Sequence, residues 1–295
     1  MENLATPTVR IVPTATLTLT PDSLPTINSS LLKTPLPTET PTPKPPDQVL
    51  NSPNGEFVAE FDNAYSHPAS APQVIQILDK NGSLLWEIPY QHEIFQSDPH
   101  PSLRIYGWSE DSSYLYFYYD FSPDGGDFAF WWDGFDLQRI NVENGEIEQV
   151  IPGDREGNVA FAFSPDGTLL AYTRQQDNPS VIYIRNLLTG KEKTTQVITP
   201  SKNYTRVGDF HWHPSGNEIA FQTESEDYIA QTIVLNPLTM IQKVVREYMV
   251  STSYFQGWSE DGTLEFFDIE PNVSIVHVNP KSGETTVIGT PTPGS

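Results

Sequence analysis

Short stretches of alternating apolar and polar residues, separated by tight-turn sequences, recur along most of the chain. The clearest stretch runs from Phe161 to Thr173 and reads as a strand, a turn and a second strand. Its turn, Ser164-Pro165-Asp166-Gly167, has a proline that pre-sets φ, an aspartate that can bond its own backbone and a glycine free to take positive φ. The aromatic and aliphatic flanks are typical of a half-buried antiparallel pair, so this stretch predicts a β-hairpin.

Four other stretches repeat this plan at intervals of about 50 residues, which is the spacing of propeller blades. The five turns begin at Ser52, Ser109, Ser164, His213 and Ser259. The sequence Ser122-Pro123-Asp124-Gly125 is an alternative turn for the second unit. We prefer Ser109 for that turn, because the preceding Trp108 then aligns with the tryptophans that precede two other turns.

Other positions align on the same register. The residue before each turn is aromatic in four of the five units, and the residue before that one is mostly small. This pattern fits an innermost strand near an axis, with the large ring wedged between neighbouring blades. A third strand follows and ends at Asp79, Asn141, Asn186, Asn236 or Asn279, which are residues that start turns. A fourth strand completes each unit. The sequence therefore predicts an all-β protein, a five-bladed β-propeller of four-stranded antiparallel blades.

The residues of the third unit resemble a known repeat. Phe163-Ser164-Pro165-Asp166-Gly167, followed by Leu170-Ala171-Tyr172-Thr173 and Ile182-Tyr183-Ile184-Arg185-Asn186, is similar to the TolB-type propeller repeat, a relative of the WD repeat. The resemblance covers residues 47–295. It implies the fold and is nearly silent on function, because such repeats occur in periplasmic TolB, in prolyl oligopeptidases and in surface proteins without an assigned role. The chain departs from the repeat at Asn51, His213 and Met240.

The sequence divides the chain into two parts. Residues 1–46 contain eleven threonines and ten prolines, a composition that predicts a disordered, extended linker or spacer. Residues 47–295 are expected to form the propeller, with blades at approximately 47–95, 101–152, 156–200, 203–248 and 252–290. Spacers of this kind resemble those that hold bacterial surface proteins or lipoproteins away from the membrane. The resemblance implies an extracellular or cell-envelope location, although no signal peptide is visible after Met1.

Charge and composition narrow the classes of partner. The formal net charge is −22, which disfavours nucleic acid and a bare anionic membrane as partners. The chain has no cysteine, so thiolate chemistry is excluded. No apolar run approaches the ~20 residues of a membrane-spanning helix.

Long loops are the expected carriers of binding, because the connections between second and third strands and between blades share one face of a propeller. The largest is Tyr119–Gly134, and another spans residues 91–103. The candidate binding residues in these two loops include four aromatics and two histidines: Phe128, Phe130, Trp131, Trp132, His92 and His100. The rings either form a platform for a protein or glycan or pack over the blade. The second interpretation is the commoner one for aromatic side chains.

The same large loop carries four aspartates that complete the candidate site: Asp120, Asp124, Asp127 and Asp133. Carboxylate oxygens at short spacing suit calcium. However, the spacing of a helix-loop-helix calcium site is missing, and an acidic protein has many solvated aspartates. We therefore predict no metal and no other cofactor, with calcium as the alternative.

Catalytic motifs are scarce. The sequence has no Gly-x-Ser-x-Gly elbow and no phosphate-binding glycine loop. We predict a non-catalytic, exported propeller that binds a protein or glycan through its long-loop face. The alternative is a hydrolase or lyase that acts on a sugar or lactone with acidic residues at the central funnel, where Asp47 and Asp209 are the acidic inner-strand residues.

Overall fold

The computed structural model divides the chain into two units, Met1–Pro46 and Asp47–Ser295. The residues that it describes are 48–62, 73–90, 102–120, 134–151, 159–174, 181–198, 204–225, 227–269 and 272–289. The predicted Thr/Pro-rich spacer lies outside these ranges. Within them no helix is long and apolar enough to cross a membrane.

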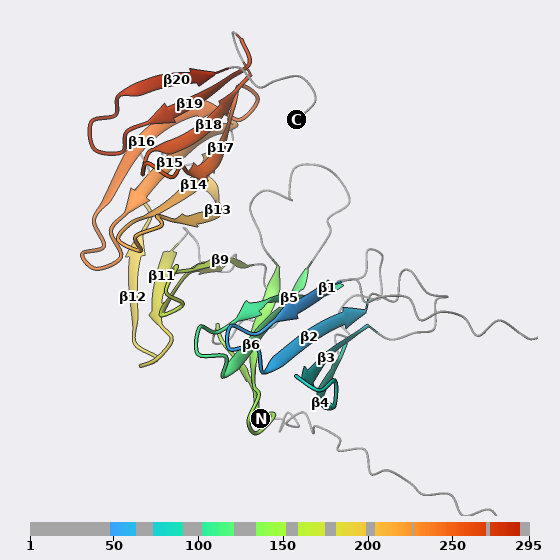
Figure 1. Ribbon diagram of the computed structural model, residues 1–295. Coiled ribbons are helices and arrows are strands. Elements are labelled where there is room, and N and C mark those ends of the chain that lie inside the picture. The colour runs from blue at the N-terminus through green and yellow to red at the C-terminus, as the bar shows by residue number, and fades with distance from the viewer. Residues whose placement is uncertain are drawn as a thin grey trace, which may run out of the picture. The chain divides into compact units, whose positions relative to one another are not determined.

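The described residues form five four-stranded antiparallel sheets, each a meander of four consecutive strands (Figure 1). The five-bladed β-propeller is thereby confirmed, and no described strand crosses from one sheet to another. Blade one contains β1 (Gln48–Asn51), β2 (Phe57–Asp62), β3 (Val74–Asp79) and β4 (Leu84–Pro89); blade two contains β5 (Ser102–Trp108), β6 (Tyr114–Asp120), β7 (Phe135–Asn141) and β8 (Ile147–Gln149); blade three contains β9 (Val159–Phe163), β10 (Leu169–Arg174), β11 (Val181–Asn186) and β12 (Glu192–Gln196). Blade four contains β13 (Tyr204–Trp212), β14 (Ile219–Ser225), β15 (Ile229–Leu235) and β16 (Gln242–Met249); blade five contains β17 (Ser253–Trp258), β18 (Leu264–Asp268), β19 (Ser274–Val278) and β20 (Thr285–Gly289).

The turn between the first two strands of a blade forms as its sequence predicts. In blade three the Ser164 hydroxyl donates to the Asp166 carboxylate and accepts the amide of Leu169 at 2.9 Å. Gly167 takes a φ of 65°. The turn at Ser109 joins β5 to β6, so the preferred register for blade two is confirmed.

Two residues take positive φ where the other blades have glycine. Ser112 has a φ of 62° in the first turn of blade two, and Met240 has a φ of 61° in the turn between β15 and β16. The sequence predicts that His213, at the turn-start position, caps its turn, and it does so, because its Nδ1 accepts the amide of Ser215 at 3.0 Å. The sequence predicts the third strand of blade four over Thr232–Leu235, and the strand begins three residues earlier, at Ile229.

The tryptophans before the turns lie between successive blades. This confirms the prediction that the large ring before a turn is wedged between neighbouring blades. Each indole Nε1 donates to a main-chain carbonyl of the preceding blade. The three pairs are Trp108 to Leu50 at 3.0 Å, Trp212 to Ala162 at 2.9 Å and Trp258 to His211 at 2.9 Å. Phe163 has no such donor, and its ring contacts Tyr106 and Tyr116 of blade two instead, with centroids 4.6 and 4.7 Å away.

The hydrophobic core follows the same arrangement, because each of its four clusters is shared by two successive blades. Phe61 and Phe117 belong to the cluster of blades one and two, and Phe221 to that of blades three and four. These rings are almost fully buried, and complete burial of one such side chain contributes about 1.5–3 kcal/mol. The first unit begins with an inner strand and the last ends with an outer one, so the sequence predicts closure of the ring by packing of blade one on blade five; this stays a prediction.

Candidate functional site

The candidate residues of the two long loops lie outside the described residues. These are His92, His100, Asp124, Asp127, Phe128, Phe130, Trp131, Trp132 and Asp133. Asp120 is the last residue of β6, where its backbone pairs with Ser102. Among the described residues no group of three or more histidine, aspartate or glutamate side chains could hold a metal ion.

The long-loop face is the end of the propeller that carries the connections between the second and third strands. In blade four this connection, from β14 to β15, is short. Two apolar side chains are exposed there, Tyr228 with an exposed fraction of 62% and Met249 with 52%. Tyr228 takes a φ of 60°, a conformation that costs a bulky residue free energy and that often marks functional sites. Sequence reasoning missed both residues, because a short Asp-Tyr turn looks like an ordinary strand connection.

Backbone hydrogen bonds hold the two ends of the segment that joins blade four to blade five, one within each blade. The carbonyl of Tyr228 accepts the amide of Val250 at 3.0 Å, and the carbonyl of Thr252 accepts the amide of Ile269 at 2.9 Å. Val273, at the start of β19, has an exposed fraction of 42%. We call Tyr228, Met249 and Val273 the apolar rim. These hydrogen bonds fix the main chain next to the rim, so the backbone there needs little ordering before it meets a partner.

A pair of polar side chains, Asp209 and His211, lies on the first strand of blade four. Asp209 takes a φ of 53° at a bulge in β13, and this conformation brings its carboxylate next to the His211 ring. The distance from Asp209 Oδ1 to His211 Nε2 is 2.7 Å. Neither side chain is buried, with exposed fractions of 25% and 36%. The pair therefore combines fixed geometry with access to solvent.

Strands β14 and β16 hold the carboxylate in place. The side-chain amide of Gln222 donates to Asp209 Oδ2, and its carbonyl accepts the hydroxyl of Tyr248 at 2.5 Å. Burial raises the pKa of Tyr248, and the charge of Asp209 raises it further. The phenol therefore stays protonated and keeps donating to Gln222.

The other ring nitrogen of His211 lies against Gly257 of blade five. A Cβ atom at position 257 would come within 2.9 Å of His211 Nδ1, so the absence of a side chain at Gly257 allows the ring to lie this close to blade five. Because Nε2 donates to the carboxylate, Nδ1 carries the lone pair. A carboxylate-oriented imidazole of this kind can accept a proton from a bound molecule.

The sequence singles out Asp209 as an acidic inner-strand residue, but it does not join Asp209 to His211. It places His211 and His213 on one face of their strand, because Trp212 lies between them, and both rings do face β17, where they contact Phe255 and Trp258. The pairing of Asp209 with His211 depends on the bulge in β13, which simple strand alternation does not predict.

The chain is similar in structure to several known propellers. No protein family and no curated protein matches its sequence. TolB from Acinetobacter baumannii is 11% identical with a TM-score of 0.44, and the likeness covers 81% of this chain and 52% of TolB. The chain thus spans about half the length of that protein.

Two further structures extend this comparison. The periplasmic gluconolactonase PpgL of Pseudomonas aeruginosa is 13% identical with a TM-score of 0.46, over 84% of this chain and 71% of the other. A prolyl endopeptidase is 9% identical with a TM-score of 0.51, over 84% of this chain and 36% of the other. At these identities the likeness concerns the fold alone.

Proposed function

We propose that this chain is a non-catalytic propeller of the cell envelope that binds a protein partner through its long-loop face. The apolar rim carries the proposal. Tyr228 and Met249 are exposed on that face, and aromatic and methionine side chains are enriched at protein interfaces. We expect the aromatic residues of the loop 119–134 on the same face of the propeller, because that loop joins the second and third strands of its blade.

The experiment uses matched positions on the two ends of blade four. A photoreactive amino acid replaces Tyr228 in one full-length variant and Leu238 in another. Leu238 is equally suitable as a reporter, with an exposed fraction of 71%, but it lies in the turn from β15 to β16 at the opposite end. We expect a defined protein adduct in producing cells from position 228 and none from position 238. A glycan adduct, or equal labelling from both positions, would contradict the proposal.

The pair of Asp209 and His211 favours a second candidate function, hydrolysis or elimination on a sugar or lactone. His211 Nδ1 would accept the proton, and Asp209 would hold the ring and stabilise the imidazolium. Asp209→Asn keeps the shape but removes the charge. If the full chain turns over a lactone panel, D209N should lower kcat by at least tenfold with an unchanged melting temperature. Equal turnover by both proteins would exclude a catalytic role for the pair.

A further inference from the structure

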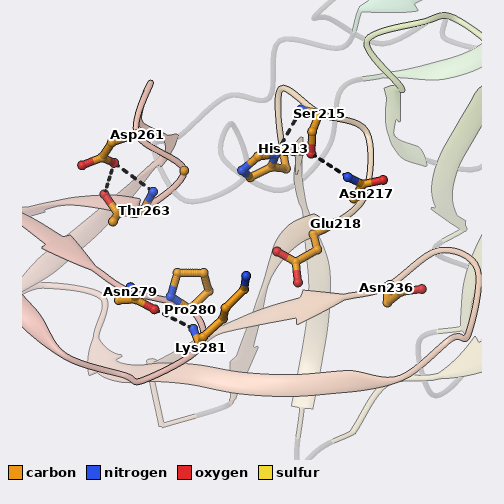
Figure 2. Close-up of a pocket in the computed structure, with 11 residues that line it drawn as sticks. His213, Ser215, Asn217, Glu218, Asn236, Asp261, Thr263, Asn279, Pro280 and Lys281 are labelled. Atoms are coloured by element: carbon orange, nitrogen blue, oxygen red, sulfur yellow. Dashed lines mark hydrogen bonds between the residues drawn. The ribbon is translucent and has the colours of Figure 1, made fainter.

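A hollow of about 380 Å³ lies between blades four and five, at the end opposite the apolar rim (Figure 2). Four turns surround it: the two turns of blade four and the two turns of blade five. Its polar lining includes His213, Glu218, Asn236, Asp261, Asn279 and Lys281. The volume suits a small molecule.

Two of the lining residues depart from the repeat in the same turn. His213 stands where the other four blades have serine. Glu218 stands where the first three blades have Phe57, Tyr114 and Leu169, which pack against the core. An apolar residue at this position would add to the core, so a carboxylate there has no evident structural benefit.

Lys281 adds a cation to the lining. It occupies the turn position held by Glu143, Leu188 and Leu238 in the three preceding blades. Lys243 of blade four fixes the turn that carries it, because Lys243 Nζ donates to the carbonyls of residues 280 and 281 at 2.7 and 2.6 Å. In Figure 2 the side chains of Lys281 and Glu218 extend toward the same space. An imidazole, a carboxylate and a cation therefore line one hollow.

His213 presents a defined hydrogen-bond donor at this site. Its Nδ1 accepts the amide of Ser215 at 3.0 Å, so in the neutral ring the proton lies on Nε2. This edge of the ring lies over Gly262, where a Cβ atom would come within 2.8 Å of Nε2. The lining thus contains a cation and an N–H donor as well as carboxylates.

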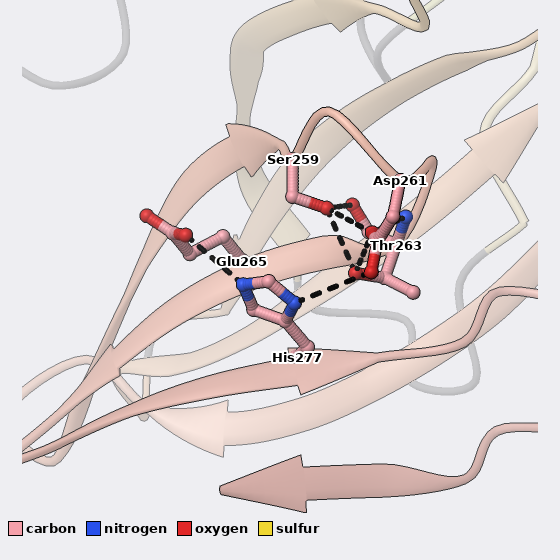
Figure 3. Close-up of polar contacts among 5 residues, drawn as sticks. All are labelled: Ser259, Asp261, Thr263, Glu265 and His277. Carbon is pink, nitrogen blue, oxygen red and sulfur yellow. Dashed lines mark hydrogen bonds and ion pairs between the residues drawn. The ribbon is translucent and has the colours of Figure 1, made fainter. Parts of the chain in front are cut away.

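Asp261 supplies a second carboxylate whose charge is well supported (Figure 3). Its Oδ1 accepts the hydroxyls of Ser259 and Thr263 and the amide of Thr263, and these bonds lower its pKa. Behind it, His277 lies between Asp261 Oδ2 at 3.8 Å and Glu265 Oε2 at 3.1 Å. All three bonds fall on Oδ1 and Oδ2 faces His277, so Asp261 brings a negative charge to the lining.

We propose that this hollow binds a small zwitterion of the amino-acid class. Lys281 Nζ and the His213 Nε2–H would bind the carboxylate of the ligand, and Glu218 and Asp261 would bind its ammonium group. A ligand with both charges satisfies both halves of the lining, whereas a simple anion or cation leaves one half unpaired. This site is independent of the long-loop face and of the Asp209–His211 pair.

Titration calorimetry on the full chain tests the proposal with four probes: L-glutamine, propionate, propylamine and glucose. We expect saturable binding of L-glutamine, and binding at least tenfold weaker for each of the other three. Equal or tighter binding of propionate, propylamine or glucose would overturn the proposal, as would the absence of binding by L-glutamine.

Variants that restore the repeat separate binding from folding. The triple variant H213S/E218L/K281L places the residues of other blades at the three positions, so it should keep its melting temperature and lose L-glutamine binding. K281Q is a single surface change that should weaken binding at least tenfold. K80Q, in the matching turn of blade one, is the control and should bind as the parent does. Retention of binding by folded K281Q and by the folded triple variant would refute the assignment.

Discussion

The indole Nε1 of Trp212 donates to the carbonyl oxygen of Ala162 across 2.9 Å, and so joins blade four to blade three. Trp258 makes the equivalent bond to His211. Because each acceptor belongs to the first strand of the preceding blade, these bonds connect the blades at their inner strands.

Trp212→Phe should therefore destabilise the propeller without changing its fold. The variant removes one hydrogen bond and leaves the Ala162 carbonyl without its donor, at a cost of about 1–2 kcal/mol. Trp258→Phe should lose a similar amount, because its geometry is the same. Urea unfolding followed by tryptophan fluorescence measures both changes. Unaltered midpoints for both variants would show that the indole bonds contribute nothing.

Lysines on the outer strands make a second set of connections. Lys193 Nζ donates to the carbonyl of Leu238 at 2.8 Å, as Lys243 does to the next blade. Lys243→Met should speed hydrogen exchange of the Gly283 amide roughly threefold to tenfold, since a hydrogen bond at an exposed site is worth about 0.5–1.5 kcal/mol. Lys80→Met, which removes an ion pair with Glu56 within blade one, is the control and should leave this amide unchanged.

The turn aspartates should make the propeller sensitive to acid. Hydrogen bonds from Ser109, Ser164 and Ser259 lower the pKa values of the aspartates two residues later, Asp111, Asp166 and Asp261. A carboxyl group whose pKa is lower in the folded chain stabilises the fold above its unfolded pKa of about 3.9. This contribution is lost as the pH falls through the folded value.

The melting temperature should thus fall steeply below about pH 4, and Asp166→Asn should reduce this fall. Blade one offers the matched change, because Asn54 already occupies the aspartate position and accepts the Ser52 hydroxyl at 2.8 Å. Asn54→Asp should increase the acid sensitivity. Calorimetric melting between pH 7 and pH 3 measures both effects, and identical profiles for the two variants would contradict the explanation.

Gly262→Ala should cost more stability than Gly167→Ala. Both glycines have positive φ, 78° and 65°, so each alanine is strained by about 1–2 kcal/mol. At position 262 the new Cβ would also meet His213 Nε2, whereas nothing lies within 4 Å at position 167. Adding His213→Ser should remove the difference between the two alanines. Chemical denaturation of the four variants tests this, and an unchanged difference would rule out the clash.

The repeated elements could be predicted from sequence because each is specified locally. Ser164-Pro165-Asp166-Gly167 determines its own turn, and the alignment of Trp108 with Trp212 was enough to predict where the blades meet. The Asp209–His211 pair could not be predicted, because it needs a bulge in β13 and an amide from Gln222 on the neighbouring strand. Long-range polar contacts of this kind leave no periodic pattern in a sequence.

The hollow was missed for a similar reason. His213 was noticed as a departure from the repeat, but Glu218 and Lys281 lie in different turns and blades. Their convergence depends on how blade five docks on blade four, including the bonds of Lys243 to the turn that carries Lys281.

The direction of the indole bonds also bears on synthesis. In all three cases the later blade supplies the donor and the earlier blade supplies the acceptor. As the chain leaves the ribosome, each new tryptophan can meet a carbonyl that has already been made. The blades can then fold one after another from the amino terminus, because each completed sheet offers the carbonyl that the tryptophan of the next sheet binds.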